Sequence, residues 1–225
     1  MRNILRQSWQ SYRQHFLMIV AVVVTVWTPL ELLSSYMDAF VFGEDDFRKS
    51  WKFAQFLDNF FGIIATAGVV FIGYEALTGQ RVTFGAAVST GFTSWGRMWW
   101  TRFLSGLALL LGFLLLVVPG VYLLVRLSLV EPVAVQERIS GSAAMRRSFQ
   151  LTDGRFWVVF RLGLALLAIV VLALVVFVLP TAFVPALDHW LIDAASQLAC
   201  DVVMAFCTIA LVTAYSHFKN EQTTA

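Results

Sequence analysis

The sequence predicts an all-α integral membrane protein, with six transmembrane helices in three hairpins and a short cytoplasmic interfacial helix before each hairpin. Hydrophobic residues make up 59% of the chain and charged residues only 13%, with a mean hydropathy of +0.77. Soluble domains carry about 25% charged residues. The 225 residues provide room for roughly six spans of about 20 residues with short connections. We therefore expect one membrane domain over 1–225.

Uncharged apolar runs give the positions of the spans. Four segments are predicted at 16–36, 54–77, 158–179 and 192–215. The remaining apolar stretch, 103–136, is 34 residues long. As one straight helix it would measure about 51 Å, too long for a hydrocarbon core of about 30 Å. We predict that Pro119 and Gly120 divide it, because proline interrupts helical hydrogen bonding and glycine accepts turn dihedrals.

The distribution of Lys and Arg decides whether this division is a turn or a kink, since cytoplasmic loops carry the excess of basic residues. A turn places twelve of the 16 basic residues inside, and a kink leaves only six there. The twelve are Arg2, Arg6, Arg13, Arg81, Arg97, Arg102, Arg138, Arg146, Arg147, Arg155, Arg161 and Lys219. We therefore predict a hairpin, with both termini cytoplasmic and the loops 37–53 and 180–191 outside. Its arms of about 24 Å favour local bilayer thinning or a turn below the outer surface.

Three stretches that precede predicted hairpins resemble one another. They read ILRQSWQSYRQHF, AAVSTGFTSWGRMWW and AAMRRSFQLTDGRFW. Each combines a short potential helix that carries an aromatic residue with a polar break, an arginine and further aromatics. The chain is therefore interpreted as three repeat units over 1–77, 83–137 and 142–217. The alternative is that aromatic and basic residues gather at any cytoplasmic membrane interface.

The third of these stretches predicts an amphipathic helix that lies in the membrane interface. Ser142 is the expected N-cap, residues 143–151 form the helix, and Gly154 turns the chain into the next segment. The arginines of this region would face lipid phosphates, each contributing about 1 kcal/mol near an anionic leaflet. The predicted head-group ligands are Arg146, Arg147 and Arg155. The alternative is that these arginines only orient the segments.

Five ionisable residues fall at membrane depth, where charged groups are rare and often functional. They are Glu31, Asp58, Arg126, Glu131 and Asp201. Arg126 lies six residues beyond the predicted outer turn, about 9 Å into the membrane, and therefore requires an acidic partner. Matching of depths predicts a contact between Arg126 and Glu31, with Asp201 as the second choice.

The stretch LLVVPGVYLLVRLSLVEPVAVQE, followed by AAMRRSFQLTDGRFW, resembles the membrane domain that precedes the catalytic domain in some bacterial glycerophosphoryl diester phosphodiesterases, and related YciC-like inner-membrane proteins. The matching residues are Pro119, Gly120, Arg126, Pro132, Glu137, Arg146, Arg147, Ser148, Leu151, Thr152 and Gly154. The resemblance is strongest over 114–160. It implies a six-span, multi-pass protein of the bacterial inner membrane and brings no activity, because the catalytic domain is absent.

The residues favour a protein that is not an enzyme and has no cofactor, metal or nucleic-acid partner. No His-Glu-x-x-His pair or phosphate-binding glycine loop is present, and the histidines are scattered at positions 15, 189 and 217. One function class is a module that organises anionic lipids of the cytoplasmic leaflet or a protein partner, including a second copy. The other is a transporter or channel for a small solute. A transport pathway predicts a polar cavity open to one side, and a scaffold predicts closed packing with paired charges.

Five glycines in the second and third segments favour the module over the transporter. Those in question are Gly62, Gly68, Gly73, Gly106 and Gly112. Their positions in the second and third segments indicate close helix packing rather than unwound substrate sites.

Overall fold

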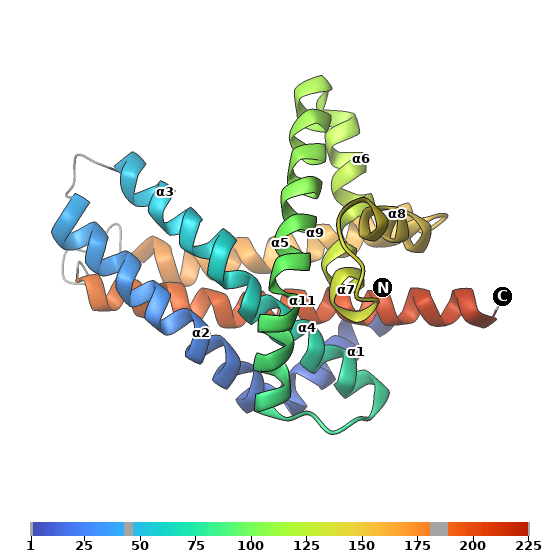
Figure 1. The fold of residues 1–225 in the computed structure, drawn as a ribbon, viewed down its shortest axis with the longest axis horizontal. Coiled ribbons are helices and arrows are strands. Elements are labelled where there is room, and N and C mark those ends of the chain that lie inside the picture. The colour runs from blue at the N-terminus through green and yellow to red at the C-terminus, as the bar shows by residue number, and fades with distance from the viewer. Residues whose placement is uncertain (1, 43–46, 181–188, 225) are drawn as a thin grey trace.

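The computed structural model describes residues 2–42, 47–180 and 189–224, and within these ranges the chain is helical apart from short connections. The described chain contains six helical stretches that are long and apolar enough to cross a membrane. They are Phe16–Phe42, Arg48–Thr78, Phe84–Leu115, Val117–Gln136, Phe156–Val178 and Trp190–Thr223. The predicted all-α class and the six membrane-length segments are thus confirmed. Figure 1 shows the order of the helices.

The N-terminal helix α1 (Arg2–Gln14) is amphipathic, and its buried residues Ile4, Ser8 and Tyr12 recur every four positions. This face packs on α11 (Trp190–Thr224). The Tyr12 hydroxyl donates to the carbonyl oxygen of Val202 at 2.9 Å. Burial raises the pKa of Tyr12 to about 12, so its phenol is a neutral donor. A break at His15 separates α1 from α2 (Phe16–Met37), which continues into η1 (Asp38–Phe42).

The second span consists of α3 (Phe47–Leu57), the π-helical turn η3 (Asp58–Gly62) and α4 (Ile63–Thr78). α4 packs closely on α5 (Phe84–Leu115) because glycines allow the backbones to approach. A Cβ at Gly91 would lie 2.5 Å from the carbonyl oxygen of Ile64, and one at Gly68 would lie 3.2 Å from that of Ala87. Close packing is thus found at Gly68.

The predicted polar break before the third segment is wrong, because α5 is one helix of 32 residues. Thr83 is its N-cap and accepts a hydrogen bond from the Ala86 amide. A buried stripe, made mostly of small or polar residues with one methionine, continues through the expected break. It comprises Ala87, Gly91, Ser94, Met98, Thr101 and Ser105. α5 packs against α4, α7 and α8, and this packing stabilises the helix through the expected break.

The predicted turn at Pro119 and Gly120 is wrong in position. The chain reverses at Leu116, which is extended (φ −167°, ψ 157°), and Pro119 lies in the first turn of α6 (Val117–Leu127). Proline is favoured there because its missing N–H would have no helical partner. A Cβ at Gly120 would meet the Phe113 ring, so Gly120 provides contact between α5 and α6 instead of a turn.

After α6 come α7 (Val130–Gln136), α8 (Gly141–Thr152), α9 (Phe156–Ala173) and η4 (Leu174–Val178). The expected helix over 143–151 exists, but its N-cap is Ser140 and not Ser142, and no side chain caps it. Gly141 (φ +58°) turns the chain into α8, and a Cβ there would crowd the Trp100 indole. Gly154 (φ +68°) ends α8 in the left-handed conformation, as predicted.

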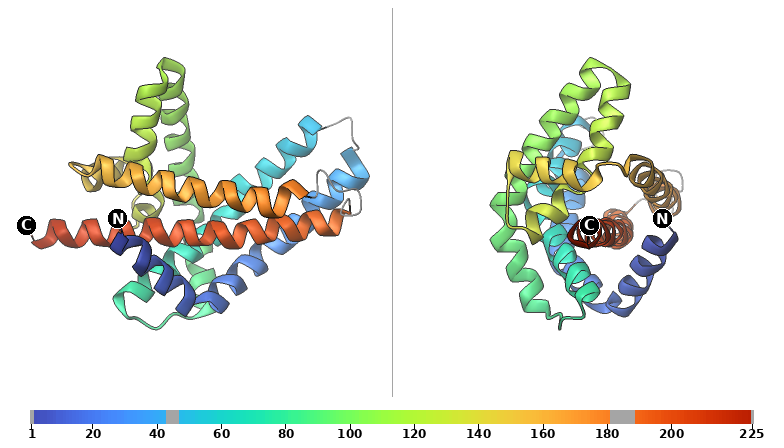
Figure 2. Two further views of the ribbon diagram at one scale, coloured as in Figure 1. Left: turned by 180° about the vertical axis from the view of Figure 1, so that it is seen from behind. Right: turned by 90° about the vertical axis from the view of Figure 1, so that its right-hand side faces the viewer.

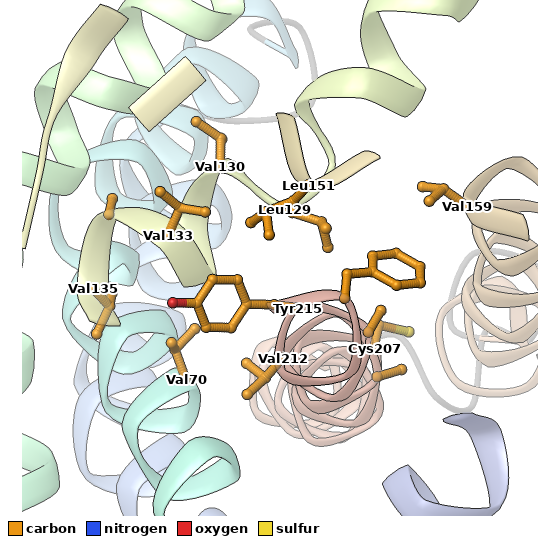
Figure 3. Packing of buried hydrophobic residues seen from close by; sticks show 14 of the residues in the cluster. Val70, Leu129, Val130, Val133, Val135, Leu151, Val159, Cys207, Val212 and Tyr215 are labelled. Carbon is orange, nitrogen blue, oxygen red and sulfur yellow. The ribbon is translucent and has the colours of Figure 1, made fainter. Parts of the chain in front are cut away.

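The main core forms where α4, α7, α8, α9 and α11 meet. Tyr215 of α11 is fully buried, and Figure 3 shows its ring among valines of α4 and α7. Its hydroxyl donates to a Glu137 oxygen at 3.1 Å and lies 3.0 Å from the Lys219 Nζ. These contacts connect the end of α7 to the C-terminal part of α11.

Two groups of helices diverge from the region of the main core. α5 and α6 extend together in one direction, while α2, α3, α9 and α11 extend in another (Figures 1 and 2). The predicted sixth segment, 192–215, is shorter than α11, which extends beyond it at both ends, from Trp190 to Thr224.

Candidate functional site

A cavity of about 1590 Å³, called here the acidic chamber, lies between α2, α3, α4, α5, α7 and α11. Four of the five ionisable residues predicted at membrane depth line it: Glu31, Asp58, Glu131 and Asp201. Arg102 of α5 lines the same cavity. A cavity of this size is larger than most small-ligand sites, which run from about 300 to 1,000 Å³.

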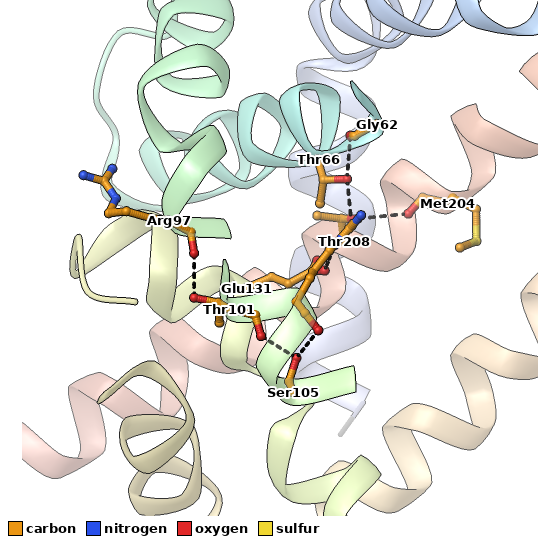
Figure 4. Close-up of polar contacts among 9 residues, drawn as sticks. Gly62, Thr66, Arg97, Thr101, Ser105, Glu131, Met204 and Thr208 are labelled. Atoms are coloured by element: carbon orange, nitrogen blue, oxygen red, sulfur yellow. Dashed lines mark hydrogen bonds and ion pairs between the residues drawn. The ribbon is translucent and has the colours of Figure 1, made fainter. Parts of the chain in front are cut away.

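Arg102 and Glu131 form the ion pair of the chamber. The Arg102 Nε lies 2.6 Å from Glu131 Oε1, and its Nη2 donates to Thr66 Oγ1 at 3.3 Å. Both charged side chains are about one quarter exposed, at 26% and 27%. Thr66, Ser105, Glu131 and Thr208, from four different helices, lie around this contact (Figure 4). The pair therefore connects α4, α5 and α7 at the inner end of the cavity.

The other three predicted deep carboxylates make no direct ion pair, although Asp58 is close enough to Arg102 to interact with it electrostatically. Among the residues that the structure describes, Glu31, Asp58 and Asp201 make no ion pair, and Asp201 Oδ2 is buried without a hydrogen-bond partner. The three are close enough to interact electrostatically, Glu31 with Asp58 and Asp201 with both. Carboxylates at this separation disfavour one another's ionisation, and a cation bound between them would favour their charged forms.

The backbone around Asp58 is irregular and makes room for its side chain. Asp58 begins the π-helical turn η3, a feature that is frequent at functional sites. A Cβ at Gly62 would lie 2.7 Å from Asp58 Oδ1 and would overlap the Trp27 ring. The Trp95 indole N–H donates to the carbonyl oxygen of Phe60 in the same turn. Gly62 therefore makes room for the side chains of Trp27 and Asp58. The predicted close approach of two helix backbones is not found at this glycine.

The remaining lining makes the chamber acidic and partly aromatic. Among the described residues that line it, the six acids are Glu31, Asp38, Asp58, Glu131, Asp193 and Asp201, and Arg102 is the one Lys or Arg. Three indole rings also line it: Trp27, Trp51 and Trp190. A cleft with one sign of charge concentrates counter-ions, and aromatic faces attract organic cations. Gly106 lines the same cavity with open space around it, so the predicted close packing is absent at this glycine.

The predicted pairing of Arg126 with Glu31 is wrong, and so is the second choice, Asp201. Arg126 does not line the chamber, and its Nη2 lies 3.1 Å from Asp153 Oδ1. Its guanidinium stacks between the rings of Tyr122 and Phe149, at 5.6 and 5.1 Å. The reason is the early turn: α6 has only eleven residues, so Arg126 falls in its last turn, beside α8.

The predicted lipid ligands, two on α8 and one at the start of α9, separate into two kinds. The Arg147 Nε contacts both Glu137 oxygens at 3.1 Å. The Arg155 Nη2 lies 2.8 Å from Glu221 Oε2. Arg146 is exposed, so it is the one whose side chain remains directed to the surroundings. Sequence reasoning assigned all three to lipid because a basic helix face does not reveal acidic partners on other helices.

Sequence reasoning missed Arg102, which was counted only as a cytoplasmic charge. Its position directly before the uncharged run 103–125 was a possible signal, since an arginine at the start of a span can face the protein interior. Glu131 was recognised at membrane depth. Its partner, 29 residues earlier, depended on how α5 and α7 pack.

The described ranges contain no group of three or more His, Cys, Asp and Glu residues that could hold a metal ion. No known protein family matches the chain, and no solved structure is significantly similar to it. The fold is that of a helical protein with the character of a multi-pass membrane protein, and its helices line a partly open acidic chamber.

Proposed function

We propose that this protein is a membrane carrier that binds small organic cations in the acidic chamber. The observation that carries the proposal is the lining, in which six acids face a single arginine and three indole rings. Carboxylates supply charge complementarity, and tryptophan faces supply affinity for an ammonium group with apolar substituents. Arg102 is already paired with Glu131, which leaves the carboxylates of Glu31, Asp58 and Asp201 for the solute.

The proposal selects the transporter class over the lipid-organising module. A scaffold would have its intramembrane charges paired, whereas three of the four deep carboxylates have no ion pair among the described residues. The module receives support from the exposed Arg146 on α8. That feature is compatible with a carrier, because basic residues also orient spans in the membrane.

The proposed membrane placement has both termini in the cytoplasm of a bacterial cell, three hairpins, and α1 and α8 at the inner interface. It rests on the charge distribution and on the family resemblance of 114–160. The chamber then opens outward, because Asp38, Trp51 and Asp193 lie next to the predicted outer loops. When the chamber is open outward, a solute enters it from outside and meets Arg102 and Glu131 at the end nearer the cytoplasm.

In this placement the pair α5 and α6 ends inside the hydrocarbon core and does not cross it. Arg126 contacts Asp153, whose side chain is 79% exposed and marks the cytoplasmic interface. Leu116 lies ten residues before Arg126, about 15 Å away at most, whereas the core is about 30 Å thick. The residues of the tip, 114–118, are all leucine or valine and 68 to 80% exposed.

The backbone of this tip fits an apolar environment, where unpaired polar groups are costly. The Leu116 N–H donates to Gly112, and the Leu116 carbonyl accepts from Gly120, both at 3.2 Å. Pro119 has no N–H to satisfy. A single cysteine at Leu116, in a chain with Cys200 and Cys207 replaced, should be inaccessible to an impermeant maleimide. A fluorophore attached to it in detergent should be quenched by nitroxide-labelled acyl chains after reconstitution. Rapid maleimide labelling from outside would show that the pair crosses the bilayer.

Binding to the purified protein in lipid nanodiscs tests the cation proposal. Choline and tetraethylammonium serve as probes, and 3,3-dimethylbutan-1-ol serves as the neutral isostere of choline. We expect the ammonium probes to bind and the alcohol not to, with Asp201→Asn and Glu31→Gln weakening binding about tenfold each, the equivalent of one charge-assisted contact. Glu221→Gln removes a carboxylate outside the chamber and should leave binding unchanged.

Uptake completes the test of the carrier. Proteoliposomes should accumulate the labelled probe that binds best, and Asp201→Asn should abolish the accumulation. Equal binding of the alcohol, or absence of binding for every ammonium probe, would exclude the cation-binding chamber.

A further inference from the structure

A second, smaller cavity of about 330 Å³ lies between α4, α5 and the end of α7, and it shares no lining residue with the acidic chamber. It lies on the side that the charge distribution places in the cytoplasm. Two arginines, three hydroxyl side chains, an amide and one carboxylate line it. They are Arg97, Arg138, Thr90, Thr93, Ser94, Gln136 and Glu75, together with Phe71 and Val135.

Arg97 has hydrogen-bond donors that the protein does not use. Its Nη2 donates to Ser94 Oγ at 3.1 Å, while its Nε is buried and has no hydrogen-bond partner. No carboxylate among the described residues lies within ion-pair distance of it. A guanidinium has five donors, and a buried donor without a partner costs about 1 to 3 kcal/mol. Because Ser94 Oγ accepts from Arg97, the hydroxyl proton of Ser94 remains free to donate to a ligand.

Arg138, which lines the same cavity, has a strained backbone. Its φ of 55° lies in the left-handed region, and among the described residues no other non-glycine residue has a positive φ. Such a conformation costs about 1 to 3 kcal/mol and is concentrated at functional sites. Glycine would adopt it without strain, yet the position carries an exposed arginine that lines the cavity.

The two guanidinium groups and the hydroxyls match a phosphate, and Glu75 adds a second requirement. An anion with no positive group would satisfy Arg97 and Arg138 but would face the Glu75 carboxylate, which has no ion pair in the described chain. A zwitterion that carries a phosphate and an ammonium group complements all three charges. We propose that this cavity binds a phosphoethanolamine group, with Arg97 and Arg138 on the phosphate and Glu75 on the ammonium.

The group can belong to a phosphatidylethanolamine head group or to soluble O-phosphoethanolamine. Native mass spectrometry of the full chain with each lipid, and calorimetry with the soluble compound, distinguish these sources. We expect retention of phosphatidylethanolamine in preference to phosphatidylglycerol, and weaker binding of the soluble compound because it lacks the acyl chains. Stronger binding of the soluble compound would assign the site to a cytoplasmic solute with the same chemistry.

Three variants test the roles of the residues. Arg97→Gln should weaken retention of both lipids about tenfold, the equivalent of one charge-assisted contact. Glu75→Gln should remove the preference for phosphatidylethanolamine while leaving phosphatidylglycerol retained. Arg161→Gln is the matched control, since Arg161 is exposed on α9 and does not line the cavity.

Arg138→Gly provides a variant that folds without strain, because glycine accepts the left-handed backbone. It should increase thermal stability and still lose lipid retention, a combination that a purely structural role does not give. Equal losses in Arg97→Gln and Arg161→Gln, or no preference between the lipids in the parent protein, would overturn the proposal.

Discussion

Replacement of Arg102 by methionine tests whether the acidic chamber is stabilised by its one cation. Arg102→Met removes the 2.6 Å contact with Glu131 and leaves that carboxylate near Asp58. Loss of one partner of a buried pair costs about 3 to 5 kcal/mol. Because both side chains are about one quarter exposed, we expect roughly 2 kcal/mol. For a chain of this length that corresponds to a fall in Tm of about 4 to 8 °C.

The partner substitution should cost less, and this asymmetry is the sharper part of the prediction. In Glu131→Gln, Asp58 still interacts with the Arg102 guanidinium, so we expect a loss of about 1 kcal/mol. The double variant should lose less than the sum of the two single variants, since each removes the same interaction. Asp153→Asn is the control: the Asp153 side chain is 79% exposed, so solvent screens its ion pair with the more buried Arg126, and the pair should contribute less than about 1 kcal/mol.

The assay is thermal unfolding of the purified variants in one detergent, at one pH and salt concentration, followed by circular dichroism. A loss in Glu131→Gln equal to that in Arg102→Met would refute the shared role of Asp58. Additive losses in the double variant would show that the two residues do not stabilise the fold through their mutual contact.

Three further predictions concern helix packing, the basic helix and the outer loop. Gly91→Ala should destabilise the fold by about 1 to 3 kcal/mol in thermal unfolding, because a Cβ would overlap the backbone of α4, whereas Gly163→Ala, with open space around it, should be neutral or slightly stabilising. Arg147→Gln should lower Tm by a few degrees because it loses contacts with two other segments, while Arg146→Gln should leave Tm unchanged; equal effects would contradict the assignment of their surroundings. A cysteine at Glu44, outside the described residues, should react with an impermeant reagent in intact cells, and labelling only after lysis would refute the placement of the first loop.

Much of the candidate site could be predicted from residue type and depth alone. Glu31, Asp58, Glu131 and Asp201 were identified as functional candidates because each interrupts an apolar run, where a charge is costly unless it has a role. That cost depends on the local sequence and the membrane, so it can be recognised without tertiary structure. Their convergence on one cavity could not be predicted, since it depends on the rotation of four helices about their axes.

The turn of the second hairpin shows a similar limit. Pro119 and Gly120 indicated correctly that the long apolar stretch is divided, but either residue is compatible with a turn, a kink or a helix start. The observed reversal at Leu116 is fixed by contacts between α5 and α6, in which Gly112 and Gly120 approach each other. A local sequence pattern does not contain these contacts.

The sequence by itself determined the helical class, the membrane-length segments and the acidic residues within them, because hydropathy and the rise of a helix depend on neighbouring residues. The tertiary structure decided which charges meet. Arg102 pairs with Glu131, 29 residues further along the chain, and Arg126 pairs with Asp153, 27 residues further along. Depth along the membrane constrains one coordinate of a side chain, whereas an ion pair requires all three, and the other two are fixed only when the helices pack.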